Sequence, residues 1–355
     1  MGNPFVKVNL KKLGHNIKVV NELCNKMGIE IFGVTKVFCA RKEICSVMIE
    51  NGINTLADSR IKNLEKIRDL NCKRVLLRIP CLSEAKEVVL NCDISLNSEI
   101  ETIKALDNEA KKENIVHNII LMIDLGDLRE GILPEDILTV VEEVLKLKNI
   151  NLKGIGTNLT CYGGIIPDNE NLSKLTEIKS ELEEKFKITL SIVSGGNSSS
   201  LYKVFDNSMI KGINNLRLGE SLLLGKETAF GEDIKGCFTD VFTLNAEVIE
   251  LKSKSSMPKG KIGRDAFGNI PCFEDKGIMN RAIVNLGKQD VRVEGISPKD
   301  KDIEVLGASS DHLILNLSKS NKNYKLGDTI EFNMDYGALL QSMTSEYIDI
   351  KYVVE

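Results

Sequence analysis

Up to about residue 230, short apolar runs alternate with longer amphipathic stretches. The apolar runs occupy residues 30–36, 53–57, 74–79, 92–96, 118–124, 152–158, 189–194 and 213–217. Runs of this length are typical of buried strands, and amphipathic stretches between them are typical of helices that cover a parallel sheet. Eight strand–helix units therefore predict an α/β fold, a (β/α)8 barrel of the TIM type. The rival, a doubly wound sheet, would carry a G-x-G-x-x-G turn that this sequence lacks.

The amphipathic stretches carry the signals of helix ends. In residues 134–148, Pro134 and two acids open the stretch and two lysines close it, as the helix dipole favours. Residues 41–50, 59–70 and 170–186 also predict helices. A strand (5–8) and a helix (10–27) are expected before the barrel.

After residue 230 the periodicity changes. Strand-like segments are separated by turns rich in Gly, Pro, Asn and Lys, at residues 241–251, 282–285, 303–306, 313–317, 329–333 and 345–353. This pattern is typical of antiparallel sheets. We therefore expect two domains, a barrel over residues 1–230 and a C-terminal β domain over residues 231–355.

Composition excludes several classes of protein. The 355 residues carry a net charge of −4 with acids and bases interspersed, so no basic surface for nucleic acid is expected. No run approaches the length of a membrane span. The nine cysteines are scattered without a C-x-x-C pair, which predicts reduced thiols in a cytoplasm. The three histidines are too dispersed to predict a metal site.

The first chemical candidate is Lys36, at the end of the first barrel strand. A lysine at the carboxyl end of a buried strand is poorly solvated, which favours its neutral amine. A neutral amine is the form that makes a Schiff base.

Other polar residues follow the later strands, where barrel enzymes place their sites. The seventh strand runs into Ser194-Gly-Gly-Asn-Ser-Ser-Ser200 and the eighth into Arg217-Leu-Gly-Glu220, while Arg129 follows the fifth. Glycines and hydroxyls there can cradle an anion with backbone N–H groups. A lysine amine, an anion cradle and two arginines at one barrel mouth describe a pocket for pyridoxal 5'-phosphate.

At this point the chain resembles the alanine racemase family of fold-type III pyridoxal phosphate enzymes, and within it the ornithine racemase branch. The resemblance covers nearly the whole chain, through GVTKVFCARKEI, MIDLGDLREGI, GIGTNLT, SGGNSSSL, NLRLGESLLLG, IGRDAFGN, LGASSDH and MDYGALLQSMTS. It implies an amino-acid racemase that uses pyridoxal 5'-phosphate. It also implies a homodimer in which the β domain of one subunit closes the barrel of the other.

The resemblance assigns roles to individual residues. Lys36 matches the Schiff-base lysine, and Arg129 matches an arginine near the phenolic oxygen of the cofactor. Asn158 occupies the place of a histidine that packs on the cofactor ring. The remaining matches are phosphate contacts at Asn197, Ser198, Gly219, Glu220 and Tyr336, and a carboxylate-binding loop from a partner subunit at Ser309, Ser310 and Asp311.

Arg217 is the most diagnostic match, because the family places it against the pyridine nitrogen. A guanidinium keeps its proton, so the nitrogen stays unprotonated and the ring is a weaker electron sink. That arrangement suits a racemase, in which the carbanion should be short-lived.

Two departures from the family concern catalysis. Racemisation needs a base on each face of the α-carbon, and the tyrosine that supplies the second base in alanine racemases is missing here. Asp265 is the preferred substitute, and the thiolate of Cys272 is an alternative. Arg264 could lower the pKa of a neighbour but is itself a poor acid–base group. Met122 stands where many members carry a modified lysine, so Arg129 must be oriented in another way.

The substrate and the reaction leave alternatives open. Extra acids near the mouth (Asp127, Glu130, Glu220 and Asp311) suit a cationic substrate such as ornithine or lysine, with alanine as the other candidate. A non-catalytic pyridoxal phosphate carrier would end near residue 230. A fold-III decarboxylase would carry Glu-Pro-Gly-Arg in place of residues 217–220, and a metal-dependent aldolase would need a His/Cys ligand pair.

Overall fold

The computed structural model describes residues 2–354, which divide into two compact units. One, the barrel unit, is Lys12–Thr239; the other, the β unit, combines residues 2–11 with residues 240–354. The sequence analysis placed residues 1–230 in the barrel, whereas the structure has residues 5–9 in the sheet of the β unit. Throughout residues 2–354, every helix is too short or too polar to span a bilayer.

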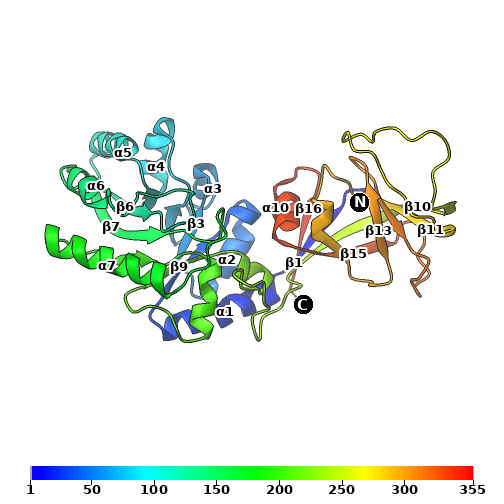
Figure 1. The fold of residues 1–355 in the computed structure, drawn as a ribbon, viewed down its shortest axis with the longest axis horizontal. Coiled ribbons are helices and arrows are strands. Elements are labelled where there is room, and N and C mark those ends of the chain that lie inside the picture. The colour runs from blue at the N-terminus through cyan, green and yellow to red at the C-terminus, as the bar shows by residue number, and fades with distance from the viewer. Residues whose placement is uncertain (1, 355) are drawn as a thin grey trace. The chain divides into compact units, whose positions relative to one another are not determined.

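The barrel unit is a closed barrel of eight parallel strands, as the sequence predicts (Figure 1). The strands are β2 (Glu30–Val34), β3 (Thr55–Asp58), β4 (Lys73–Leu76), β5 (Ile94–Asn97), β6 (His117–Ile123), β7 (Ile150–Thr157), β8 (Ile192–Ser194) and β9 (Asn215–Leu218). Each falls within or overlaps one of the eight apolar runs. The predicted fold class is therefore confirmed.

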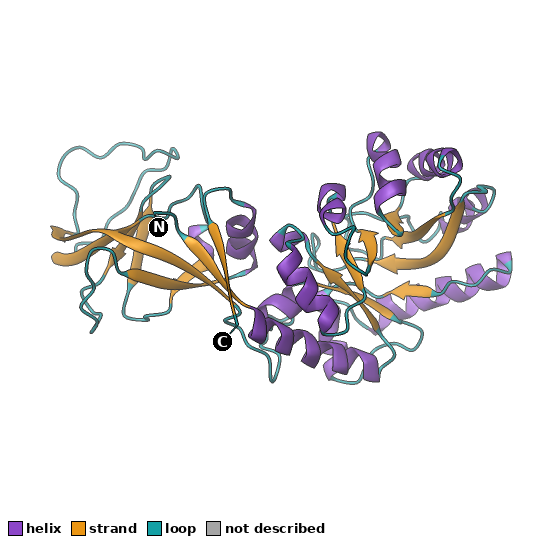
Figure 2. Cartoon of the chain, turned by 180° about the vertical axis from the view of Figure 1, so that it is seen from behind, coloured by secondary structure: helices purple, strands orange, loops and turns teal. Residues whose placement is uncertain are grey.

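Helices surround these strands (Figure 2). They are α1 (Leu10–Lys26), α2 (Lys42–Glu50), α3 (Ile61–Lys66), α4 (Ala85–Asn91), α5 (Ile100–Lys112), α6 (Ile137–Val144), α7 (Asn169–Phe186), α8 (Leu201–Phe205) and α9 (Glu220–Leu224). Short 3-10 turns occupy η1 (Lys36–Phe38), η2 (Leu82–Glu84) and η3 (Ser198–Ser200). The helix expected over residues 134–148 is shorter in the structure, since its proline and acids precede the first turn and its lysines follow the last.

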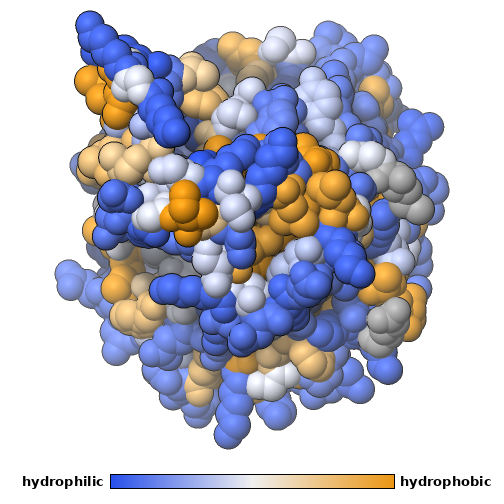
Figure 3. Space-filling model, turned by 90° about the vertical axis from the view of Figure 1, so that its right-hand side faces the viewer, coloured by the Kyte–Doolittle hydropathy of each residue, from blue (hydrophilic) through white to orange (hydrophobic). Residues whose placement is uncertain are grey.

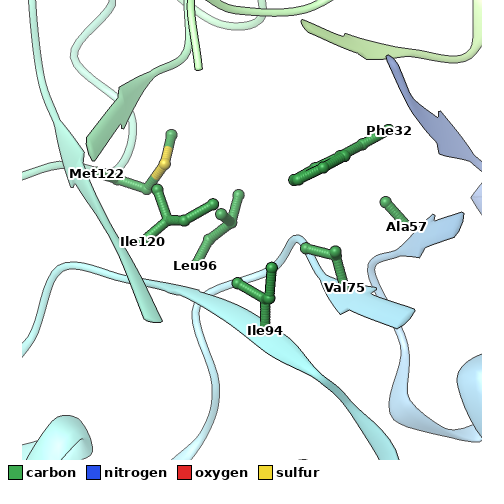
Figure 4. Packing of buried hydrophobic residues seen from close by; sticks show 7 residues of the cluster. All are labelled: Phe32, Ala57, Val75, Ile94, Leu96, Ile120 and Met122. Atoms are coloured by element: carbon green, nitrogen blue, oxygen red, sulfur yellow. The ribbon is translucent and has the colours of Figure 1, made fainter. Parts of the chain in front are cut away.

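The interior of the barrel is filled by apolar side chains, one or two from each of five consecutive strands. Figure 4 shows seven of them pointing toward one another: Phe32, Ala57, Val75, Ile94, Leu96, Ile120 and Met122. All are buried. A packed interior leaves the strand ends as the place for polar chemistry.

The β unit contains an antiparallel sheet in the order β12-β15-β10-β11-β14-β13. Its elements are β10 (Phe242–Ser255), β11 (Ile278–Val284), η4 (Val293–Gly295), β12 (Ile296–Pro298), β13 (Glu304–Ala308), β14 (Leu313–Asn316), β15 (Thr329–Met334), α10 (Tyr336–Thr344) and β16 (Asp349–Val353). The first strand of the chain, β1 (Phe5–Asn9), pairs antiparallel with β10 and parallel with β16.

Polar and apolar side chains are mixed on the surface. On the face drawn in Figure 3, hydrophobic side chains gather in small patches among hydrophilic ones. In the β unit, the exposed large hydrophobic side chains include several from the long loop between β10 and β11: Met257, Ile262, Phe267, Ile270 and Phe273.

Candidate active site

Eight of the predicted site residues lie at or just beyond the carboxyl ends of the barrel strands. Lys36 opens η1, two residues after β2. The neighbouring strand is β9, in register such that Phe32 pairs with Arg217. Gly219 lies against β2, since a Cβ added to it would come 3.1 Å from the Cβ of Val34. The turn that carries Lys36 therefore adjoins the end of the strand that carries Arg217, at one mouth of the barrel.

A tight turn holds the backbone of Lys36. Cys39 and Ala40 have φ angles of 54° and 50°, in the left-handed region that non-glycine residues rarely adopt. Their N–H groups bond to the carbonyl oxygens of Lys36 (3.3 Å) and Thr35 (3.2 Å). The Lys36 side chain itself is exposed. This corrects the expectation of a poorly solvated lysine, because Lys36 lies beyond the last residue of the buried strand.

Arg217 is buried, at 5% exposure, and neutral acceptors hold its guanidinium. Nη1 donates to Ser194 Oγ (2.6 Å), and Nη2 donates to the Thr157 carbonyl (2.8 Å) and to Asn158 Oδ1 (3.4 Å). Burial lowers the pKa of Arg217 to about 10, which leaves the group charged at neutral pH. The Ser194 hydroxyl in turn donates to Asn215 Oδ1 (2.6 Å).

The buried side-chain amide of Asn158, beside Arg217, has an N–H donor that makes no hydrogen bond to any residue the structure describes. Asn158 is 7% exposed, and its oxygen accepts from Arg217 and from Asn197 Nδ2 (3.3 Å). Within residues 2–354, Asn158 Nδ2 has no hydrogen-bond partner. A buried donor without a partner carries a free-energy cost, so this nitrogen fits a ligand that brings an acceptor.

The glycine- and serine-rich loop after β8 gathers further donors. The side chain of Asn197 caps η3 by accepting from the Ser199 N–H (2.8 Å) and donates to the Leu159 carbonyl (2.9 Å). Ser198 Oγ is 3.1 Å from Ser221 Oγ, at the start of the helix that follows Gly219. The loops after β8 and β9 are thus joined, and this set of hydroxyl and amide donors fits an anion such as phosphate.

A second rigid loop, residues 124–132, presents Arg129. The Asp124 carboxylate accepts from the N–H groups of Gly126 (2.9 Å) and Leu128 (3.2 Å). Gly131 has a φ of 148°, and a Cβ there would come within 2.2 Å of the Asp124 nitrogen. A side chain at position 131 would therefore force this loop open.

Asp127 joins that loop to the one after β7. Its buried carboxylate accepts from the N–H groups of Tyr162 (3.0 Å) and Gly163 (3.1 Å). Because both oxygens serve the backbone, Asp127 is a structural residue. This corrects the expectation that it is an acid available to a cationic substrate.

The other five predicted site residues belong to the β unit, where Asp265 forms a turn. Its Oδ1 accepts from the N–H groups of Phe267 (2.9 Å) and Asn269 (2.8 Å). The hydrogen bond from Asn269 holds the pKa of Asp265 below its usual range. Asp265 is exposed, and in this turn its carboxylate is a weak base.

The loop between β13 and β14 is ordered by its own hydroxyls. Ser309 Oγ (3.2 Å) and Ser310 Oγ (3.1 Å) both donate to Asp311 Oδ1. His312 Nδ1 lies 2.9 Å from the same oxygen, and this contact lowers the pKa of Asp311. Tyr336 is the first residue of α10, whose N-cap is Asp335.

Sequence reasoning missed Ser194, which accepts a hydrogen bond from Arg217, and Asn215, which accepts one from Ser194. Strand order could have found them, because β8 lies between β7 and β9 in the barrel and its last residue must neighbour both. Within residues 2–354, no three His, Cys, Asp or Glu side chains gather as metal ligands do.

Comparisons with known proteins identify the family of this chain. The family model described as alanine racemase, N-terminal domain, matches residues 8–226. An ornithine racemase of Acetoanaerobium sticklandii is 51% identical over 347 residues, 98% of each chain. A lysine racemase of Thermotoga maritima is 40% identical over 351 residues, again 98% of each.

Solved structures show the same fold. An alanine racemase of Clostridium difficile superposes with a TM-score of 0.77 at 18% identity, covering 99% of this chain and 96% of that one. An alanine racemase of Bartonella henselae with covalently bound pyridoxal phosphate gives 0.75 at 16% identity, covering 99% and 100%. The family model and the two relatives show that the chain belongs to the alanine racemase family.

Proposed function

We propose that this protein is a pyridoxal 5'-phosphate-dependent racemase that interconverts L- and D-ornithine. The observation that carries the reaction class is the buried Arg217, whose guanidinium is held by neutral acceptors. The choice of ornithine is supported by the 51% identity to an ornithine racemase over nearly the whole chain. Lysine is the second candidate, because a lysine racemase is 40% identical.

The residues at the barrel mouth would hold the cofactor. Lys36 would bind it covalently through its amine, and Arg217 would face the ring nitrogen. The unpartnered Asn158 Nδ2 would donate to it, and Arg129 would lie near its phenolic oxygen. The phosphate would be bound by Asn197, Ser198 and the backbone N–H groups of Gly219 and Glu220, with the Tyr336 hydroxyl.

When bound, pyridoxal phosphate supplies an aromatic system that accepts electrons as the α-carbon loses its proton. The amine of Lys36 would move that proton on one face. For the opposite face we propose Asp265, with Cys272 of the same loop as the alternative. The lowered pKa of Asp265 weakens it as a base, so this role requires its turn to open around the substrate.

The β unit would supply the remaining substrate contacts. Ser309 and Ser310 would receive the substrate carboxylate, and Asp311 offers a carboxylate to a second ammonium. We further propose a homodimer that shares its active sites between subunits, working in a cytoplasm where its nine free cysteines stay reduced. Sedimentation of the holoenzyme should give twice the chain mass.

One incubation tests the function. Purified protein with cofactor is given enantiopure L-ornithine, L-lysine or L-alanine, and the products are separated by chiral chromatography. We expect D-ornithine to form fastest, and K36A to abolish its formation and the visible absorption of the cofactor. The matched control is K42A, which removes an exposed lysine that pairs with Asp69.

Three results would contradict the proposal. Loss of CO2 or ammonia would indicate a lyase. Faster conversion of L-lysine would assign that substrate, and conversion of L-alanine alone would exclude a cationic one.

A further inference from the structure

The guanidinium of Arg129 is bound side-on by the carboxylate of the next residue. Nε and Nη2 of Arg129 both donate to Glu130, one to each carboxylate oxygen. The Glu130 side chain is 18% exposed and that of Arg129 is 42% exposed. A bidentate pair of this kind fixes the plane of the guanidinium and leaves Nη1 for another acceptor.

Glu130 also acts on the second arginine of the mouth. After burial, the charges that change the pKa of Arg217 include Glu130, which raises it, and Arg129, which lowers it. The two guanidinium groups are therefore close enough to repel each other, and the carboxylate of Glu130 offsets that repulsion.

The surrounding loop offers Arg129 no comparable partner. The carboxylates of Asp124 and Asp127 accept from backbone N–H groups. Met122, which points into the barrel beside this loop, is apolar and packs in the interior. The hydrogen bonds of Asp124 and Asp127 fix the backbone of the loop, but they do not involve the guanidinium of Arg129. The side chain that orients this guanidinium is therefore that of Glu130.

We propose that Glu130 is a positioning residue, which fixes the guanidinium of Arg129 toward the bound ligand and cancels its charge beside Arg217. The inference rests on the proposed function, since the ligand is the cofactor with its substrate. It differs from a role for Glu130 in binding a cationic substrate, because its carboxylate is committed to Arg129.

A double-mutant cycle tests the proposal. E130Q, R129Q and the double variant are compared as holoenzymes for kcat and KM with ornithine and alanine, and for the pH midpoint of the cofactor's visible absorption. E130Q should lower kcat by about tenfold to a hundredfold, the usual size for a charged hydrogen-bonded pair, with less change in KM. It should also shift the absorption midpoint. The double variant should be no worse than R129Q, because the two side chains act as one unit.

The matched control is E135Q, an exposed acid of the same connection, which should behave as the wild type. Additive effects of E130Q and R129Q would overturn the proposal. A rise in KM for ornithine with alanine unaffected would also overturn it, since Glu130 would then bind the second ammonium of the substrate.

A readout without substrate separates this inference from the proposed function. The Nε–H signal of Arg129, identified by its loss in R129Q, is followed by NMR in the cofactor-free protein. It should exchange slowly with solvent in the wild type and rapidly in E130Q. Equal exchange would refute the ion pair. Slow exchange in a protein that racemises no amino acid would refute the proposed function alone.

Discussion

The hydroxyl of Thr35 donates a buried hydrogen bond of 2.6 Å to Oδ2 of Asp58. Thr35 precedes Lys36, and Asp58 ends the next barrel strand, so this bond ties the turn of the lysine to its neighbour. Asp58 Oδ1 accepts from the Arg60 N–H (2.9 Å) and from Asn63 Nδ2 (3.1 Å). Burial raises the pKa of Asp58, and these hydrogen bonds oppose that rise.

Removing the hydroxyl should weaken both the fold and the reaction. T35V leaves a buried carboxylate oxygen without its donor, at a cost of about 1–3 kcal/mol in the free energy of unfolding. It should raise the pKa of Asp58 further and lower racemase kcat, because Lys36 is the next residue. Urea unfolding and kinetics measure the two effects. T35S keeps the hydroxyl and should stay close to the wild type; equal losses in T35S and T35V would refute this account.

A histidine in the barrel wall should make stability depend on pH. His117 Nε2 lies 2.8 Å from Ser95 Oγ, and burial lowers the pKa of His117 from 6.5 to about 4. Below 6.5 the unfolded chain binds a proton that the folded chain refuses, so stability falls as the pH drops from 6.5 toward 4. The full loss from this group is about 3 kcal/mol.

Urea unfolding across this range measures the slope. H117Q should flatten it, because the glutamine does not titrate. The matched variant H15Q, at an exposed histidine that bonds to the Gly236 carbonyl, should keep the wild-type slope. An unchanged slope in H117Q would show that other groups cause the acid destabilisation.

Removing one of the uncharged groups that hold the Arg217 guanidinium should weaken both the fold and the reaction. S194A removes an acceptor from Nη1 of Arg217 and a donor from Asn215 Oδ1, both buried. Each unsatisfied group costs about 1–3 kcal/mol, so we expect a lower free energy of unfolding and a lower kcat. S191A, at an exposed serine that bonds to the Lys153 carbonyl, is the control. Full activity in S194A would mean that this hydroxyl does not position Arg217.

Thiol labelling should divide the cysteines by exposure. Cys81, Cys161 and Cys272 are exposed and should react first with Ellman's reagent. Burial raises the pKa of Cys24 to about 12, so it should react only on unfolding. Because Cys161 Sγ lies 3.4 Å from Asn197 Nδ2, bound cofactor should protect it. Equal rates at Cys161 with and without cofactor would place the phosphate elsewhere.

Periodicity found the barrel because each of its strands is a local apolar run. It missed β1 as part of the sheet of the β unit, since the pairing of Phe5 with Asp349 joins opposite ends of the sequence. It also missed α10, although Asp335 is an N-cap signal, because the nine-residue helix carries a glycine at its second position.

The positions of the strand ends predicted which loops form the candidate site. They did not predict the hydrogen-bond partners of the side chains in those loops. In the sequence, Asp127 and Asp265 both look like acids available to the active site. The structure engages both with backbone N–H groups, which depends on turns that no spacing reveals. Glu130 shows the reverse, because its partner is the adjacent residue and the geometry of the pair appears only in three dimensions.

The place of β1 constrains how the chain is made. This strand leaves the ribosome before the barrel, yet its partners β10 and β16 are synthesised only after the entire barrel. During translation the backbone N–H and C=O groups of β1 therefore lack their strand partners while more than two hundred residues are synthesised. In that interval water or a chaperone must satisfy them. The barrel is in effect an insertion within the β unit, and a nascent chain stalled at residue 239 would carry an orphaned strand at its amino end.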